Sequence, residues 1–68
     1  MLGNVKRFNQ YKGFGFITGE DGKDYFFHFS EIIMDGFKTV NEGEKVEFTP
    51  IQTERGAQAH NIKAVLEG

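Results

Sequence analysis

The chain has 68 residues, a formal net charge of −2 and no cysteine. This length allows one small domain, and the absence of cysteine excludes disulfides and thiolate metal sites. The negative charge also excludes a polycation that holds nucleic acid by charge alone. Neither a membrane span nor a signal peptide is recognisable, so we expect a single domain over 1–68 that is located in the cytoplasm and contacts no membrane.

Positive charge is concentrated near the N-terminus. Residues 1–18 contain Lys6, Arg7 and Lys12 and no acidic residue, so all 10 acidic residues fall within 19–68. The aromatic residues are also uneven, because all but one of the 8 phenylalanines lie between Phe8 and Phe37. We therefore expect a basic patch beside many aromatic rings on an otherwise acidic domain.

Short β-like runs alternate with turn residues along the chain, and the glycines interrupt every window long enough for a stable helix. Strands are predicted over 3–9, 12–18, 24–29, 45–51 and 58–66. Asp21-Gly22 predicts a hairpin turn between the second and third strands, and a short helical turn is expected at 30–33. This order predicts an all-β fold, a small five-stranded antiparallel Greek-key barrel of the OB-fold type.

Side chains alternate between the two faces of a strand, which divides the aromatic residues into two sets. One face carries Lys12, Phe14, Phe16, Asp24, Phe26 and His28. Burying an unpaired lysine or aspartate is costly, so this face is expected to contact water. The predicted core consists of Val5, Ile17, Tyr25, Phe27, Ile32, Val40, Val46, Phe48 and Ile62, with Gly13 and Gly15 also pointing inward. In the alternative, Phe14 and Phe16 are core residues, which leaves Ile17 without an inward role.

Contiguous exposed aromatic rings on a small domain indicate a binding surface. Rings flanked by lysine and arginine suit single-stranded RNA and DNA, whose bases stack on them at about 1–3 kcal/mol per base. Duplexes hide the base faces that such rings contact. The competing hypothesis is a protein-interaction module that uses the same face for a partner protein. We expect a monomer, with a weak dimer as the alternative.

Two segments resemble the ribonucleoprotein motifs of a known family, the cold-shock domain: KGFGFI (12–17) and DYFFHFS (24–30). The resemblance continues through VKRFN (5–9), DGFKTVNEGEKVEF (35–48) and RGAQAHNI (55–62), and so spans nearly the whole chain. The chain is similar to stand-alone bacterial cold-shock proteins. This resemblance implies an OB-type barrel that binds single-stranded RNA and DNA and acts as an RNA chaperone, a transcription antiterminator or a cold-shock regulator.

The resemblance also implies roles for individual residues. The base-stacking platform would consist of Phe14, Phe16, Phe26, His28, Phe29 and Phe37. Its cationic rim would consist of Lys6, Lys12 and Arg55, and Asp24 and Gln58 would contact base edges.

The chain departs from the family pattern in three places, one of which is Ala57, where proline is common. Arg7 replaces the tryptophan that family members usually have, and it either stacks its guanidinium on a base or is solvated at the rim. Tyr25 and Phe27 stand where valines are usual, so the inner wall of the barrel has to accommodate more volume.

An enzyme is not expected. His28 and His60 are the only histidines, and no serine, histidine and carboxylate share a recognisable spacing. Two histidines without further ligands predict no metal site. The glycines at 13, 15 and 19 miss the dinucleotide-binding spacing by one residue, so no cofactor and no small-molecule substrate are expected.

Overall fold

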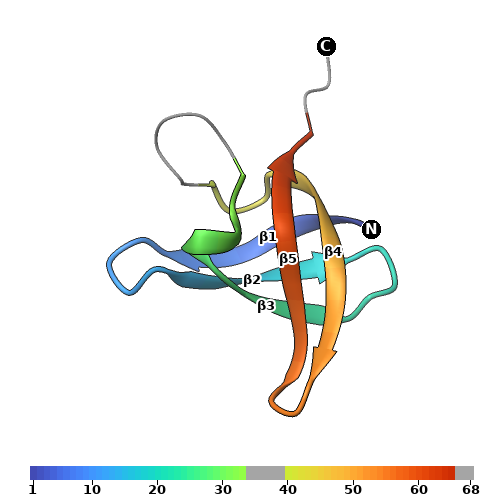
Figure 1. The fold of residues 1–68 in the computed structure, drawn as a ribbon. Coiled ribbons are helices and arrows are strands. Elements are labelled where there is room, and N and C mark those ends of the chain that lie inside the picture. The colour runs from blue at the N-terminus through green and yellow to red at the C-terminus, as the bar shows by residue number, and fades with distance from the viewer. Residues whose placement is uncertain (34–39, 66–68) are drawn as a thin grey trace.

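The computed structural model describes residues 1–33 and 40–65, which form the closed barrel shown in Figure 1. Its elements are β1 (Leu2–Asn9), β2 (Phe14–Gly19), β3 (Asp24–His28), the 3-10 helix η1 (Phe29–Glu31), β4 (Lys45–Thr53) and β5 (Gly56–Ala64). Around the barrel the strands follow the order β1-β2-β3-β5-β4. The predicted five-stranded barrel is confirmed for this part of the chain.

Two groups of strands build the barrel. β1, β2 and β3 form an antiparallel meander, and the β4–β5 hairpin runs across it (Figure 1). β1 pairs with β4 antiparallel at one junction, whereas β3 meets β5 in parallel at the other, through Phe26 and Gln58. The antiparallel prediction therefore has one exception, and this parallel junction places Gln58 beside an aromatic residue that is remote in the sequence.

The turn between β1 and β2 is longer than predicted. The Asn9 side-chain oxygen accepts hydrogen bonds from the backbone N–H groups of Tyr11 and Lys12, at 3.0 and 3.1 Å. Gly13 closes the turn at φ +76°, a conformation that favours glycine, and β2 begins only at Phe14. The prediction that Lys12 lies on the strand was wrong, and its exposure comes from the turn rather than from strand alternation.

The third strand is also one residue shorter than predicted. It ends at His28, whose Nδ1 accepts a hydrogen bond from the Ser30 N–H at 3.2 Å and thereby caps η1. Phe29 therefore opens the short helix instead of closing the strand. A helical turn was expected at 30–33 and lies at Phe29–Glu31.

A β-bulge in β1 changes the direction of its side chains. Val5 pairs with Ile17 and Arg7 pairs with Phe16, which leaves Lys6 as an extra residue between the two pairs. Lys6 and Arg7 are consequently both exposed, although simple alternation would turn one of them into the barrel. The bulge thus brings two adjacent cations to the outer surface.

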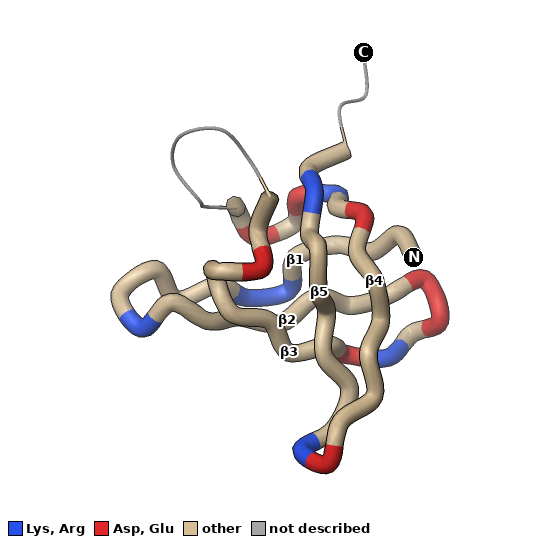
Figure 2. The backbone as a smooth tube through the Cα atoms, in the orientation of Figure 1, with Lys and Arg blue, Asp and Glu red and all other residues tan. Residues whose placement is uncertain are grey.

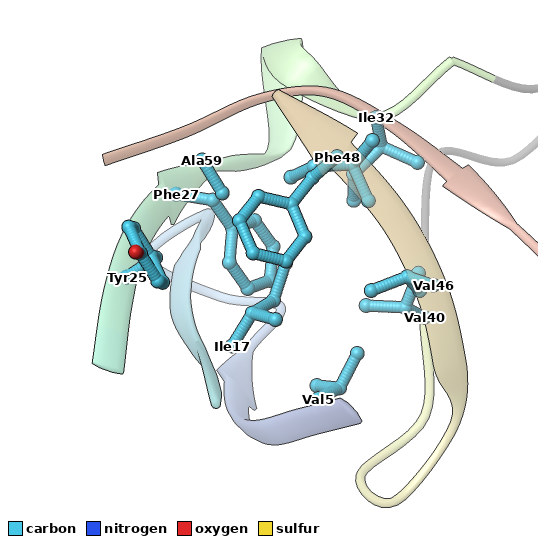
Figure 3. Packing of buried hydrophobic residues seen from close by; sticks show 10 residues of the cluster. Val5, Ile17, Tyr25, Phe27, Ile32, Val40, Val46, Phe48 and Ala59 are labelled. Carbon is cyan, nitrogen blue, oxygen red and sulfur yellow. The ribbon is translucent and has the colours of Figure 1, made fainter. Parts of the chain in front are cut away.

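Every residue predicted for the core is buried, and Ala59 joins them. In Figure 3, Phe48 faces Phe27 and Ile17 inside the barrel, with Tyr25 to one side. The Tyr25 and Phe48 rings have centroids 5.1 Å apart. Phe8, which returns to the inner face after the bulge, stacks on Phe27 at 5.6 Å.

Glycines in β2 make room for the two large residues of β3. Gly15 pairs with Phe27, and a Cβ atom at Gly15 would lie 2.9 Å from the Phe27 ring. A Cβ atom at Gly19 would likewise lie 2.9 Å from the Tyr25 ring. The inner wall therefore accommodates Tyr25 and Phe27 by placing them against residues that have no side chain.

Candidate nucleic-acid interface

Three phenylalanine rings from two neighbouring strands form a cluster on the outside of the barrel. The centroid of Phe26 lies 5.8 Å from that of Phe14 and 5.7 Å from that of Phe16. Phe16 is 37% exposed, and the other two are half-buried. Their position outside the core confirms the prediction from alternation and contradicts the alternative in which Phe14 and Phe16 belong to the core.

His28 and Phe29 extend this cluster toward the β1–β2 turn. His28 is the cross-strand partner of Phe14, and its ring centroid lies 4.6 Å from that of Phe29. Phe29 is 42% exposed and covers Gly13, where a Cβ atom would lie 2.6 Å from the ring. We refer to Phe14, Phe16, Phe26, His28 and Phe29 together as the aromatic face.

Lys6, Arg7 and Asp24 lie at the β1 side of the aromatic face, where they line an open hollow together with Phe16. Lys6 Nζ lies 2.8 Å from Asp24 Oδ2, and the Thr18 hydroxyl donates to Asp24 Oδ1 at 3.0 Å. These two donors hold the pKa of Asp24 below its ordinary value of 3.8. Because Lys6 pairs with Asp24, part of its positive charge is already balanced within the protein. The pair is open to solvent, so it contributes little to stability.

Arg55 and Gln58 lie at the opposite side of the aromatic face. They line a second hollow with Phe16, Phe26 and Ala57. Arg55 stands in the two-residue turn between β4 and β5, and Gln58 is the parallel partner of Phe26. Phe16 contributes to both hollows, so it connects the two sides of the face.

Charge is distributed unevenly around this surface. Figure 2 shows basic residues on β1 and in the β1–β2 loop, one basic and one acidic residue side by side at the tip of the β4–β5 turn, and two acidic residues near one basic residue at the β2–β3 turn. Lys12 is exposed in the β1–β2 loop. Phe37, the remaining residue assigned to the platform, lies outside the described residues.

The sequence did not point to His60, which the structure places beside one of the predicted contact residues. His60 Nε2 lies 3.1 Å from Gln58 Oε1, and His60 Nδ1 lies 3.4 Å from Glu31 Oε1. The spacing of Gln58 and His60 along one strand indicates a shared face. The approach of Glu31 from η1 depends on tertiary structure and has no counterpart in the local sequence.

Two other kinds of feature are absent from the described part of the chain. In residues 1–33 and 40–65, no three histidine or carboxylate side chains are grouped so that they could hold a metal ion. The same residues include no helix of the length and apolarity that crossing a membrane requires.

Comparisons with known proteins identify the family of the chain. The family model described as the 'Cold-shock' DNA-binding domain matches residues 1–65. Cold shock protein 2 of Lactiplantibacillus plantarum is 61% identical over 61 residues, which cover 90% of this chain and 92% of the relative. Cold shock-like protein CspE of Escherichia coli (strain K12) is 56% identical over 64 residues, which cover 93% of each chain.

A solved structure shares the fold. The structure described as drosophila Unr CSD456 superposes with a TM-score of 0.73 at 30% sequence identity. The match covers 98% of this chain and 27% of that longer chain. The family match over nearly all residues, the identity to bacterial relatives and the barrel all lead to one assignment: the chain belongs to the cold-shock DNA-binding domain family.

Proposed function

We propose that the aromatic face binds single-stranded RNA and DNA, with unpaired bases stacked on its rings. The observation that carries this proposal is the cluster of Phe14, Phe16 and Phe26, which lies outside the core beside Lys6 and Arg7. Exposed rings with adjacent cations match the two parts of a single strand, namely its base faces and its phosphates. Membership of a nucleic-acid-binding family supports the same function.

The expected affinity follows from the number of rings. Stacking of three bases at about 2 kcal/mol each contributes about 6 kcal/mol, and micromolar binding requires about 8 kcal/mol. A few phosphate contacts from Lys6, Arg7, Lys12 and Arg55 are enough to supply the difference. Affinity at this level does not require a positive net charge.

Polar side chains at the two sides of the face supply the base-edge contacts in this proposal. The Gln58 amide has both a donor and an acceptor group beside Phe26. Asp24 already accepts hydrogen bonds from Lys6 and Thr18, but each carboxylate oxygen has a further lone pair for a base amino group.

An RNA-chaperone role would follow from the same binding. A protein that stacks unpaired bases favours the melted state of a hairpin, and saturating protein at a hundred times its Kd adds about 2.7 kcal/mol to melting per site. Weak RNA hairpins would therefore open, including hairpins that terminate transcription. We propose that the chain acts in this way as a monomeric single domain.

Fluorescence anisotropy with a labelled pyrimidine-rich oligonucleotide tests the binding. We expect saturable binding at micromolar protein, a loss of about tenfold or more for Phe26→Ala, and a similar loss for Phe26→Leu, since leucine retains apolar area but not the ring. Ile33→Ala is the matched control, because Ile33 is an exposed apolar residue that lines a hollow with Thr49 and Lys63 instead of with the aromatic face.

Two outcomes would contradict base stacking. Absence of saturable binding would exclude the nucleic-acid function for this surface. Full retention of affinity by Phe26→Leu would indicate apolar contact of the kind made with a partner protein.

A molecular beacon tests the chaperone role separately. This RNA hairpin carries a fluorophore and a quencher at its two ends, and it fluoresces when the hairpin melts and the ends move apart. Saturating protein is expected to raise the fluorescence, and Phe26→Ala at the same concentration is expected to leave the hairpin closed. A hairpin that stays closed with bound wild-type protein would exclude the role while leaving single-strand binding intact.

A further inference from the structure

His60 lies between two oxygen atoms that can only accept hydrogen bonds. Its Nε2 is 3.1 Å from the amide oxygen of Gln58 on the same strand, and its Nδ1 is 3.4 Å from a carboxylate oxygen of Glu31 on η1. The backbone N–H of Asn61 also donates to this Glu31 oxygen, at 3.4 Å. The ring is therefore held at both nitrogens.

Only a ring with two N–H donors can donate to both oxygens at once. An imidazolium ring donates from both nitrogens, whereas neutral imidazole donates from only one. When the ring is neutral and its one proton is on Nδ1, toward the Glu31 carboxylate, Nε2 presents a lone pair toward Gln58. The Gln58 amide must then rotate so that its NH₂ group, instead of its oxygen, faces the ring.

Rotation of this amide changes what the protein offers to a ligand. Gln58 is the parallel partner of Phe26 and lines a hollow with Phe16 and Arg55. When its oxygen is held by protonated His60, its NH₂ group is left as the donor for the hollow. When its NH₂ group is held by neutral His60, its oxygen is left as the acceptor.

We propose that His60 is a positioning residue that sets which base edge Gln58 recognises. With His60 protonated, Gln58 donates and favours a base with a carbonyl at that edge, such as uracil or thymine. With His60 neutral, Gln58 accepts and favours a base with an exocyclic amino group, such as cytosine. This inference rests on the proposed binding of bases at the aromatic face.

Other titratable groups near His60 define the controls. On β4 the cross-strand partner of His60 is the uncharged Thr49. Glu47, two residues earlier on β4, lies opposite Lys63 in the strand register. β3 and β5 run parallel, with Phe26 opposite Gln58. His28 and His60 each follow these partners by two residues, so the two histidines occupy matching positions on neighbouring strands. Histidine changes charge between pH 5 and 8, so His28 must be separated from His60 by substitution.

The test measures the dissociation constants of the full chain for short labelled oligo-dT and oligo-dC between about pH 5.5 and pH 8. We expect the preference for oligo-dT over oligo-dC to rise about fivefold as the pH falls, since one well-placed base contact discriminates by at least this factor. His60→Gln should make the preference independent of pH. His60→Lys, which only donates, should hold the preference for oligo-dT over the whole range.

A wild-type preference that does not change with pH would overturn the proposal. A pH dependence that survives in His60→Gln would also overturn it and would point to His28.

A second measurement does not depend on nucleic-acid binding. In NMR spectra of the free protein, the side-chain amide resonances of Gln58 should follow the titration of the His60 ring. If neither oligonucleotide binds, the proposed function fails, and these resonances alone decide whether His60 orients Gln58. Amide resonances that stay constant through the His60 titration would contradict the coupling.

Discussion

Arg7 occupies the outer surface of β1 directly opposite Phe16, at the position where the family pattern implies a tryptophan. A guanidinium group can stack on a base and contact a phosphate, but it offers less flat surface than an indole ring. The hollow that Arg7 lines with Lys6, Phe16 and Asp24 is open to a ligand. In the proposed complex, the role of Arg7, stacking or charge alone, would determine how many bases the face holds.

Replacing Arg7 with tryptophan is expected to tighten binding of a single strand by about 1–3 kcal/mol, because an indole adds a full stacking surface beside Phe16. Anisotropy titrations would measure the change. Arg7→Leu is the control, since it removes the charge without adding a ring. Equal affinities for the tryptophan and leucine variants would show that no base reaches this position.

Asp21 and Tyr25 form a hydrogen bond that is lost at both low and high pH, when Asp21 is protonated or Tyr25 is deprotonated. The Tyr25 hydroxyl donates to Asp21 Oδ2 at 2.6 Å, and the Lys23 N–H donates to Asp21 Oδ1 at 3.0 Å. The bond from Tyr25, followed by that from Lys23, lowers the pKa of Asp21 from 3.8. The same bond to Asp21 raises the pKa of Tyr25 from 10.0.

Tyr25→Phe is expected to lower the melting temperature near neutral pH. The stabilisation linked to Asp21 is present above its unfolded pKa and is lost as the pH falls through the lower folded value. The stabilisation linked to Tyr25 is present below its unfolded pKa and is lost as the pH rises through the higher folded value. Thermal unfolding followed by circular dichroism should therefore show a smaller difference from wild type at both extremes of pH.

Tyr11→Phe provides the comparison, because Tyr11 is 93% exposed. We expect no such pH-dependent difference for that variant. A Tyr25→Phe difference that stays constant from acid to alkaline pH would assign the effect to packing alone.

At the scale of the elements, close contact between β1, β2 and β3 depends on Gly15. A Cβ atom at this position would meet the backbone oxygen of Arg7 and would lie 2.9 Å from the Phe27 ring. The ring can move, but the carbonyl oxygen belongs to the β1–β2 pairing next to the bulge. The outward position of Arg7 and the inward position of Phe27 therefore both require a residue without a side chain at Gly15.

Gly15→Ala is expected to lower the free energy of unfolding by about 1–3 kcal/mol, because the added methyl group overpacks the wall of the barrel. Urea denaturation would measure this change. Adding Phe27→Val should not restore stability, since the contact with the Arg7 oxygen remains and a cavity is created. A Gly15→Ala variant as stable as wild type would contradict the close packing of these strands.

At the scale of the whole molecule, few cations surround the aromatic face among the described residues, and the net charge of the chain is −2. Lys6, Lys12 and Arg55 are the basic residues assigned to the rim, with Arg7 as a fourth candidate, and Lys6 is paired with Asp24. Electrostatic attraction alone therefore contributes little to binding, and stacking has to supply most of the affinity. This balance distinguishes the surface from a simple basic patch.

The salt dependence of binding is expected to be shallow. Four neutralised phosphates give a slope of log K against log salt of about −3 for a single strand, and fewer give a smaller slope. Titrations from low to moderate salt would measure it. Asp24→Asn should steepen the slope by about 0.7 by releasing Lys6 to a phosphate. A wild-type slope near −7 would mean that many more phosphates are contacted than this rim allows.

The sequence by itself determined the barrel, the core and the outward position of the aromatic rings. Alternation within a strand is a local property, so the polar Asp24 and His28, which share a face of β3 with Phe26, were enough to identify the exposed side. The lysine used in the same argument lies in the turn before β2. Asp21-Gly22 likewise located a hairpin through local turn chemistry. The roles of these residues in binding remain predictions, and Phe37 lies outside the described residues.

Only the tertiary structure decided how the surroundings of the rings are arranged. The bulge that exposes both Lys6 and Arg7 depends on the register of β1 with β2. The contact of His60 with Glu31 requires η1, which follows β3, to lie beside β5. Such contacts join residues that are distant in sequence, and no local periodicity encodes the register that brings them together.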